Sequence, residues 1–136
     1  MSDKTKTLTQ VINEVLEVGP KEVANFDSKL AEAKINLKEK IANGYKLPLG
    51  VESHPLEDFD LDYSIQRDVR EAHCLNIAKH FDPRVCAPVS AVRRSGSKRL
   101  AIFDGQHRAV TLGLLGYTEI PVTIVETDEQ IGRAHV

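Results

Sequence analysis

The sequence predicts a mixed α/β fold, of the α+β kind, in which helices pack on a small mixed sheet behind an N-terminal helical hairpin. The first observation is that two amphipathic helical patterns fill residues 1–45. The second is that segments of strand and helix character follow the order β-α-β-β-α-β from residue 59 onward. A length of 136 residues with 41% apolar residues suits one domain with an ordinary core.

The hairpin consists of two predicted helices. Thr7 and Gln10 have the spacing of a capping box, so the first helix should cover 7–18. Gly19 should stop it, and Pro20 should open a second helix over 20–42. The apolar stripes could pack on the chain's own domain or on a second copy, so a homodimer through these helices is one expectation. The stripes are Leu8, Val11, Ile12, Val15 and Leu16, then Val23, Phe26, Leu30, Ala33, Leu37 and Ile41.

The middle of the chain has weaker patterns. Residues 46–58 contain glycine and proline without periodicity and should form a connector. Residues 59–65 alternate loosely, which predicts a short edge strand. A helix should begin near Asp68 and end before Pro83. Its inner face would carry Ala72, Leu75, Ala78 and Phe81.

A β-hairpin is the clearest local pattern. Apolar runs at 87–92 and 100–103 flank a polar stretch centred on Ser95-Gly96. The second run leads into a helix that should close at Gly116, and a last strand follows at 120–125. These elements define a predicted domain over 59–126 and leave residues 127–136 as a tail.

Composition excludes several classes of protein. A formal net charge of −2 is incompatible with a histone-like, globally basic nucleic-acid binder. No run of about 18 apolar residues is present, so we expect no membrane contact. The polar first residues predict no export signal, and two cysteines predict free thiols in a reducing compartment. We therefore expect a cytoplasmic protein.

Lysine and arginine are unevenly distributed. Eight of the ten lysines precede residue 61, and all eight arginines follow residue 60. Lysine suits a solvated helix face, whereas arginine grips carboxylates and phosphates with two hydrogen bonds. The second part of the chain is thus a candidate for anion binding, although compositional drift would give the same split.

Residues 104–108 have the pattern of an anion site. A strand ends, a glycine removes the Cβ, and a helix begins, so backbone N–H groups and the helix dipole favour an anion. Arg108 could hold phosphate, and His107 could donate a hydrogen bond or act as a general acid or base. Gln106 offers a neutral donor and acceptor, and Asp104 could cap the helix or hold a metal beside phosphate. The alternative is that Asp104 caps the helix and pairs with Arg108.

Two segments carry a resemblance to a known family. Residues 102–110 (IFDGQHRAV) and 114–122 (LLGYTEIPV) resemble the ParB/sulfiredoxin superfamily, especially bacterial and phage members with a D-G-Q-H-R signature. Residues 63–67 (YSIQR) resemble the first conserved box of such domains. The resemblance spans 59–126, about half of the chain. It implies a ParB/sulfiredoxin-like fold and a bacterial or phage process related to DNA.

The same resemblance implies a nucleotide site. ParB-type proteins grip a cytidine nucleotide with a G-E-R-R box, and sulfiredoxins hold ATP with G-C-H-R. Gln106 stands where ParB has an acid and sulfiredoxin its catalytic cysteine, so neither reaction is implied and enzymatic activity stays open. The implied ligand is CTP or ATP with Mg²⁺. The implied site comprises Gln66, Arg67, Asp104, Gly105, Gln106, His107 and Arg108, although Arg67 could instead pair with Asp62 or Asp68.

Two alternative functions remain. One is a metal-dependent nuclease or phosphohydrolase with His107 as the catalytic acid or base and Asp104 near the metal. The other is a DNA-binding adaptor that needs no nucleotide and uses the cations of the hairpin. These cations are Arg93, Arg94, Lys98 and Arg99, which could equally form a solvated turn that protects a sheet edge.

The remaining candidate groups carry no prediction of function. The spacing of His73, Cys74, His80 and Cys86 matches no zinc pattern, so we expect no protein metal site. Residues 131–136 resemble the translation of a sequencing adapter. This segment is therefore expected to be artificial, with a genuine tail as the alternative, and we assign it no role.

Overall fold

The structure, a computed structural model, describes residues 5–48, 51–62, 69–94 and 96–127. It is a mixed α/β fold, as the sequence predicts, with four α-helices and two short 3-10 helices in the described part. The helices are α1 (Leu8–Glu22), α2 (Phe26–Ala42), η1 (Leu56–Asp58), α3 (Glu71–Lys79), η2 (Pro83–Val85) and α4 (Gln106–Leu114). The strands are β1 (Thr5–Thr7), β2 (Glu52–Pro55), β3 (Phe59–Asp62), β4 (Val89–Arg94), β5 (Leu100–Asp104) and β6 (Glu119–Thr127).

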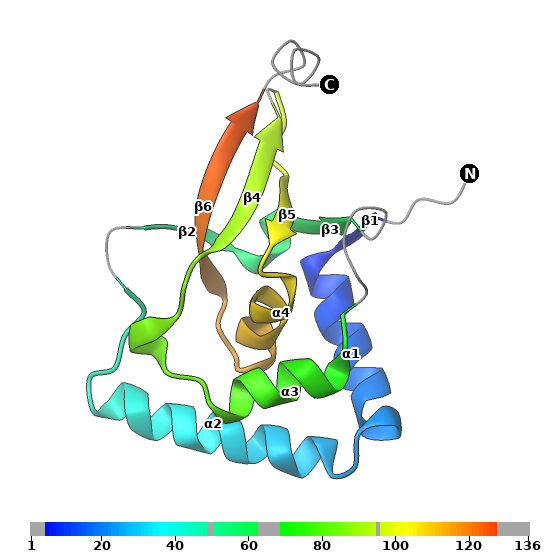
Figure 1. Cartoon of the computed structure of the whole chain (residues 1–136), viewed down its shortest axis with the longest axis vertical. Helices are drawn as coiled ribbons and strands as arrows, with labels where there is room; N and C mark the ends of the chain where they lie inside the picture. The colour runs from blue at the N-terminus through cyan, green and yellow to red at the C-terminus, as the bar shows by residue number, and fades with distance from the viewer. Residues whose placement is uncertain (1–4, 49–50, 63–68, 95, 128–136) are drawn as a thin grey trace.

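The described strands form one mixed sheet in the order β1-β3-β5-β4-β6-β2 (Figure 1). The pairs β3–β5 and β4–β6 are parallel, and the other pairs are antiparallel. Helices α3 and α4 provide the crossovers, which confirms the predicted order from β3 to β6. The predicted strand is present as β3 over Phe59–Asp62, and residues 63–65 lie outside the described residues. Its predicted place at the edge of the sheet is wrong, because β1 pairs with the outer side of β3.

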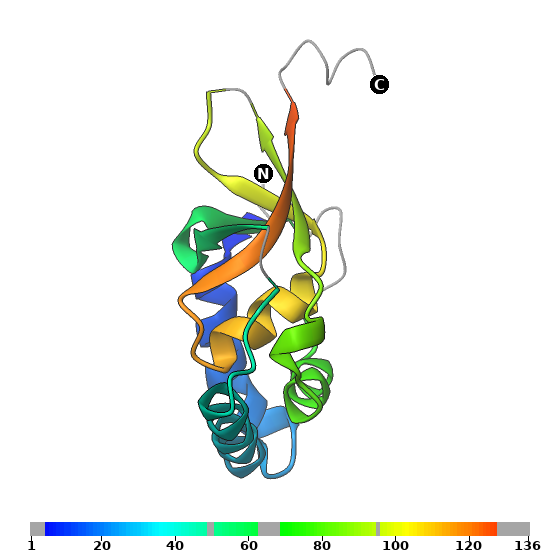
Figure 2. The ribbon, with the colours of Figure 1, turned by 90° about the vertical axis from the view of Figure 1, so that its left-hand side faces the viewer.

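One face of the sheet packs on the helices, which lie below the sheet in Figures 1 and 2. Strand β5 shows the alternation: Leu100 and Ile102 are buried, whereas Ala101 and Phe103 are exposed. A strand turns successive side chains to opposite faces, so the buried pair points toward the helices. Among the described helices, none is both long and apolar enough to cross a bilayer.

Both N-terminal helices belong to the same hydrophobic core as the sheet. The stripe of α1 from Leu8 to Val15 is buried against α4, and a Cβ at Gly113 of α4 would collide with Ile12. The stripe of α2 is buried from Phe26 to Leu37. Of the two packing alternatives for these helices, the structure shows packing on the chain's own domain. A homodimer through the N-terminal helices stays a prediction.

The start of α1 is as predicted, but its end is not. Thr7 Oγ1 accepts from the Gln10 N–H at 3.1 Å and Gln10 Oε1 accepts from the Thr7 N–H at 2.9 Å, which completes the capping box. The prediction that Pro20 opens the second helix is wrong, because α1 continues through Pro20 to Glu22. Gly19 is a packing residue: a Cβ there would lie 2.6 Å from the ring of Phe26. The turn into α2 comes later, at Asn25 with φ 58°.

The segment predicted as a connector contains structure. Residues 52–55 form β2, which pairs with β6 at the edge of the sheet, and residues 56–58 form η1. The prolines of this segment favoured a connector, because strands contain few prolines. The strand depends on pairing with β6, which is distant in the sequence. The predicted start of α3 at Asp68 lies outside the described residues; the helix is observed from Glu71, with Arg70 as its N-cap.

Candidate functional site

The turn from β5 into α4 is built around Gly105. Its φ of +89° lies in the left-handed region, which favours glycine. A Cβ at this position would lie 2.7 Å from Nη1 of Arg108 and 3.1 Å from Cγ1 of Val89. The glycine therefore serves two needs, because it makes the turn and leaves room for the Arg108 guanidinium over the start of the helix.

Asp104 and Arg108 do not form the pair that the sequence allowed. The N-cap of α4 is Gly105, and no side chain caps the helix. Asp104 ends β5 and is exposed, so the prediction that it caps α4 is wrong. Arg108 Nη1 lies 3.4 Å from the Pro88 carbonyl oxygen, and no described carboxylate forms an ion pair with it. The guanidinium consequently keeps donors for another acceptor.

His107 joins the starts of two helices. Its Nε2 accepts the backbone N–H of Arg70 at 3.0 Å, so the proton of the neutral ring is assigned to Nδ1. Its ring meets that of His73 edge to face, with centroids 4.5 Å apart. Burial lowers the pKa of His107, and the charges of His73 and Arg70 lower it further. These surroundings favour the neutral form of the His107 ring.

Stability should depend on pH through His107. Because its pKa is lower in the folded chain than the ordinary 6.5, the fold favours the neutral ring. The contribution of His107 to the free energy of unfolding is complete above pH 6.5. It is lost as the pH falls from 6.5 toward the pKa of His107 in the folded chain, since the unfolded chain then binds more protons than the folded chain. Urea unfolding at a series of pH values should show a loss of stability below pH 6.5. His107→Gln should reduce that loss, and equal pH dependence in both proteins would contradict the assignment.

The contact between α3 and α4 continues beneath His107. Thr111 Oγ1 donates to the His107 carbonyl at 2.7 Å and lies 3.3 Å from the Cys74 carbonyl oxygen. Cys74 is buried as a free thiol, and burial raises its pKa to about 12. Burial also raises the pKa of Cys86, although the nearby Arg108 charge opposes this. Neither thiol is poised to be a nucleophile, because the thiolate is the reactive form.

The four metal-capable side chains of this region do not form a cluster. His73, Cys74, His80 and Cys86 belong to the described residues, within which no group of three or more His, Cys, Asp or Glu side chains could hold a metal ion. The arrangement instead places His73 against His107, where it contributes to the lowered pKa.

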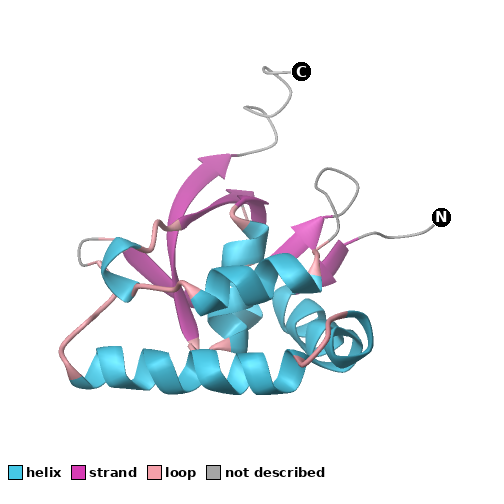
Figure 3. Ribbon diagram, turned by 60° about the horizontal axis from the view of Figure 1, so that its bottom comes forward, coloured by secondary structure: helices cyan, strands magenta, loops and turns pink. Residues whose placement is uncertain are grey.

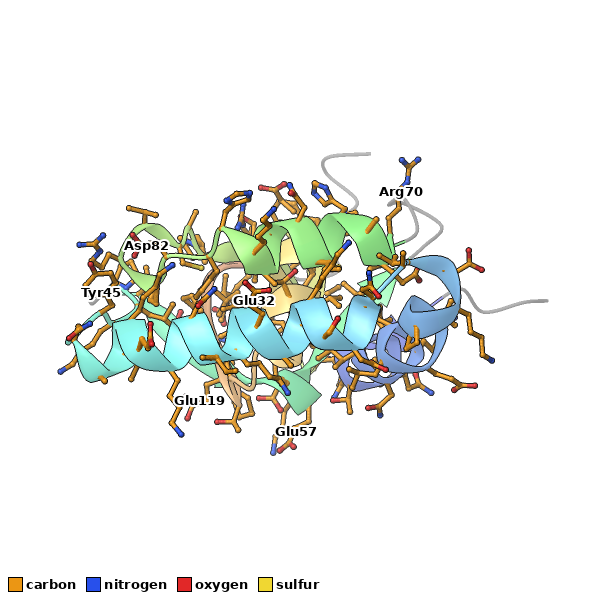
Figure 4. The ribbon with its side chains drawn as sticks, turned by 90° about the horizontal axis from the view of Figure 1, so that it is seen from below. Glu32, Tyr45, Glu57, Arg70, Asp82 and Glu119 are labelled. Carbon is orange, nitrogen blue, oxygen red and sulfur yellow. The ribbon has the colours of Figure 1, made fainter. Side chains whose placement is uncertain are left out.

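Arg70 is a site residue that sequence reasoning missed. It precedes α3, and its backbone N–H is the one that reaches His107. Its side chain is exposed and projects from the start of α3 in Figure 4. The sequence did not indicate this role, because a helix that begins at Asp68 would place Arg70 within its first turn rather than at its N-cap. The predicted partners Gln66 and Arg67 lie outside the described residues.

Two of the four cations of the β-hairpin are paired with carboxylates. Arg93 Nη2 lies 2.6 Å from Glu126 Oε1 on β6. Arg99 Nη2 lies 2.6 Å from Asp60 Oδ1, and the same guanidinium donates to two backbone carbonyls, Glu57 at 2.5 Å and Phe59 at 3.1 Å. Lys98 is exposed, and Arg94 takes part in β4 by its backbone. The hairpin therefore presents less positive charge than its sequence suggests.

Comparisons with known proteins add a likeness to solved structures. No protein-family model matches the sequence, and no curated protein matches it. Among solved structures, the crystal structure of sulfiredoxin from Arabidopsis thaliana matches with a TM-score of 0.46 and 18% sequence identity. The match covers 63% of this chain and 96% of that one. The chain is thus similar to a sulfiredoxin structure at low identity.

Proposed function

We propose that this chain binds a phosphate-bearing ligand at the start of α4, and that the ligand is a nucleoside triphosphate, CTP or ATP, with Mg²⁺. The observation that carries the proposal is the Arg108 guanidinium, which lies over Gly105 at an uncapped helix start and has no carboxylate partner among the described residues. A cation without a carboxylate partner among the described residues, at a helix N-terminus whose dipole favours negative charge, is suited to a phosphate.

Each neighbouring residue has a place in this proposal. Arg108 would hold two phosphate oxygens, and Arg70 would add a second positive charge from the start of α3. Gly105 leaves the room that the Arg108 guanidinium needs at the helix start. Asp104 is exposed, and its carboxylate could contact Mg²⁺ held by the phosphates. Gln66 and Arg67 belong to this site in the resemblance to the ParB/sulfiredoxin superfamily.

The proposal favours binding over hydrolysis. His107 uses Nε2 to accept the Arg70 N–H, so the atom needed to take a proton from water is occupied. His107 is therefore a positioning residue that aligns α3 with α4. The nuclease alternative has no specific observation in its favour. The adaptor alternative is weakened by the pairing of Arg93 and Arg99 with carboxylates. The setting that the sequence resemblance suggests is a bacterial or phage process related to DNA.

Isothermal titration of CTP, ATP and GTP with Mg²⁺ tests the proposal. We expect saturable binding of at least one triphosphate, with the nucleotide recovered unchanged after prolonged incubation. Recovery as diphosphate and inorganic phosphate would contradict the claim that the site binds without hydrolysis. Heat signals no larger than those of buffer for all three triphosphates would contradict the phosphate site itself.

A further inference from the structure

A groove with a volume of about 570 Å³ lies between α2 and α3, which run side by side in Figures 3 and 4. Its base includes the buried side chains of Ala33 and Leu75, and its rim is formed by exposed polar residues. An exposed rim above an apolar base suits a chain segment lying along the surface, since sites for small molecules enclose most of the ligand.

Both helices present the same pattern to the groove. Helix α2 contributes positions i, i+3, i+4 and i+7 counted from Lys29, and α3 contributes the same set counted from Ala72. At a rise of 1.5 Å per residue, each stripe is about 10 Å long. Helix α2 is also joined to the residues that directly follow α3, because Lys40 Nζ donates to the Phe81 carbonyl at 2.5 Å. The groove is therefore formed before any partner arrives.

Two of the three charged side chains that line the groove are basic. Lys29 stands on α2, and Lys79 is followed by His80 at the end of α3, whereas Glu32 is the acidic member of the lining. Figure 4 shows Glu32 on the side of α2 that faces α3. In the part of the chain that the structure describes, these four side chains form no hydrogen bond or ion pair with one another or with other residues.

Two amides give the groove its polar character. Asn36 on α2 and Asn76 on α3 line it, and neither side chain forms a hydrogen bond within the described residues. An amide side chain both donates and accepts, which matches the alternating N–H and C=O groups of a peptide backbone. The Glu32 carboxylate can accept a peptide N–H that lies between two acidic side chains, whereas a nucleic acid carries a phosphate at every nucleotide and offers no such neutral stretch. These groups favour a peptide over a nucleic acid.

From these observations we propose that the groove between α2 and α3 binds an acidic peptide segment of a partner protein. Two carboxylates of the segment pair with Lys29 and Lys79, and its backbone contacts Asn36, Asn76 and Glu32. In an extended peptide, acidic residues three positions apart are about 10 Å apart, which matches the length of the groove. The groove shares no residue with the start of α4, so this interaction is independent of phosphate binding.

The test uses the blocked peptide Ac-Glu-Leu-Gly-Glu-Leu-NH2 and the full-length, ¹⁵N-labelled protein. The side-chain amide signals of Asn36 and Asn76 should shift in a saturable manner, because both NH₂ groups line the groove. The matched peptide with Gln in place of Glu should bind at least about tenfold more weakly, since it lacks the charges. Unshifted Asn36 and Asn76 signals, or equal affinity for both peptides, would overturn the proposal.

Charge-reversal variants locate the interaction. Lys29→Glu with Lys79→Glu should weaken peptide binding at least about tenfold. Lys34→Glu with Lys38→Glu is the matched control, because it makes the same change in net charge at exposed positions of α2 outside the groove. Equal weakening by both pairs would show nonspecific attraction and overturn the assignment. Groove shifts caused by an oligothymidylate but not by the peptide would also overturn it.

Discussion

Arg108→Ala is expected to weaken triphosphate binding about ten- to hundredfold. The guanidinium has no carboxylate partner among the described residues. Its removal therefore leaves no described carboxylate without its ion-pair partner, and we expect the loss to fall on ligand binding. A hydrogen bond to a charged group contributes about 1.5–3 kcal/mol, which corresponds to this range. Arg108→Lys should recover part of the affinity, because it keeps the charge but loses the planar fork.

Arg93→Ala is the matched control for this loss. It removes the same charge from the hairpin, where the side chain pairs with Glu126. Titration calorimetry should show affinity within about twofold of wild type, because charges more than a Debye length of about 10 Å away are screened. An equal loss of triphosphate affinity in Arg93→Ala and Arg108→Ala would mean that triphosphates are attracted by the net charge of the protein and do not bind specifically at the start of α4.

Phe26→Ala is expected to lower the free energy of unfolding by about 3–5 kcal/mol, the usual cost of removing a buried aromatic ring. Phe26 is 1% exposed, and its ring occupies the space that a side chain at Gly19 would need. Truncation therefore opens a cavity where α1 meets α2. Urea unfolding followed by circular dichroism measures the change directly.

Ile35→Ala supplies the comparison on the same helix. Ile35 is 61% exposed, so its truncation should change stability by about 0.5 kcal/mol or less. If both variants unfold at the same urea concentration, α2 does not share the core of the sheet. That result would favour the alternative in which the N-terminal helices pack on a second copy.

Local signals in the sequence predicted the elements whose stabilising contacts are also local. The capping box of Thr7 lies within four residues, and the β4–β5 hairpin closes over a short polar loop. Gly116, with φ +103°, ends α4 as expected. The errors occur where distant contacts decide. Pro20 stays inside α1 because Gly19 packs on Phe26, and β2 exists because it pairs with β6, more than 60 residues later.

The same distinction applies to the candidate site. The helix start at Gly105 followed from the strand, glycine and helix pattern alone. The state of His107 did not, because it depends on Arg70, 37 residues earlier. Likewise, Arg99 binds Asp60 across 39 residues, so the sequence could not show that this hairpin cation is engaged. Composition indicated which part of the chain is rich in arginine, but it could not indicate which arginines lack a carboxylate partner among the described residues.

The most direct test of the phosphate site is a titration of the ¹⁵N-labelled protein with ATP or CTP in the presence of Mg²⁺, followed by two-dimensional NMR. We expect the largest shifts on the backbone amides of residues 105–108 and of Arg70, and we expect these shifts to disappear in Arg108→Ala. Shifts confined to the hairpin or to the groove between α2 and α3, with residues 105–108 unchanged, would contradict it.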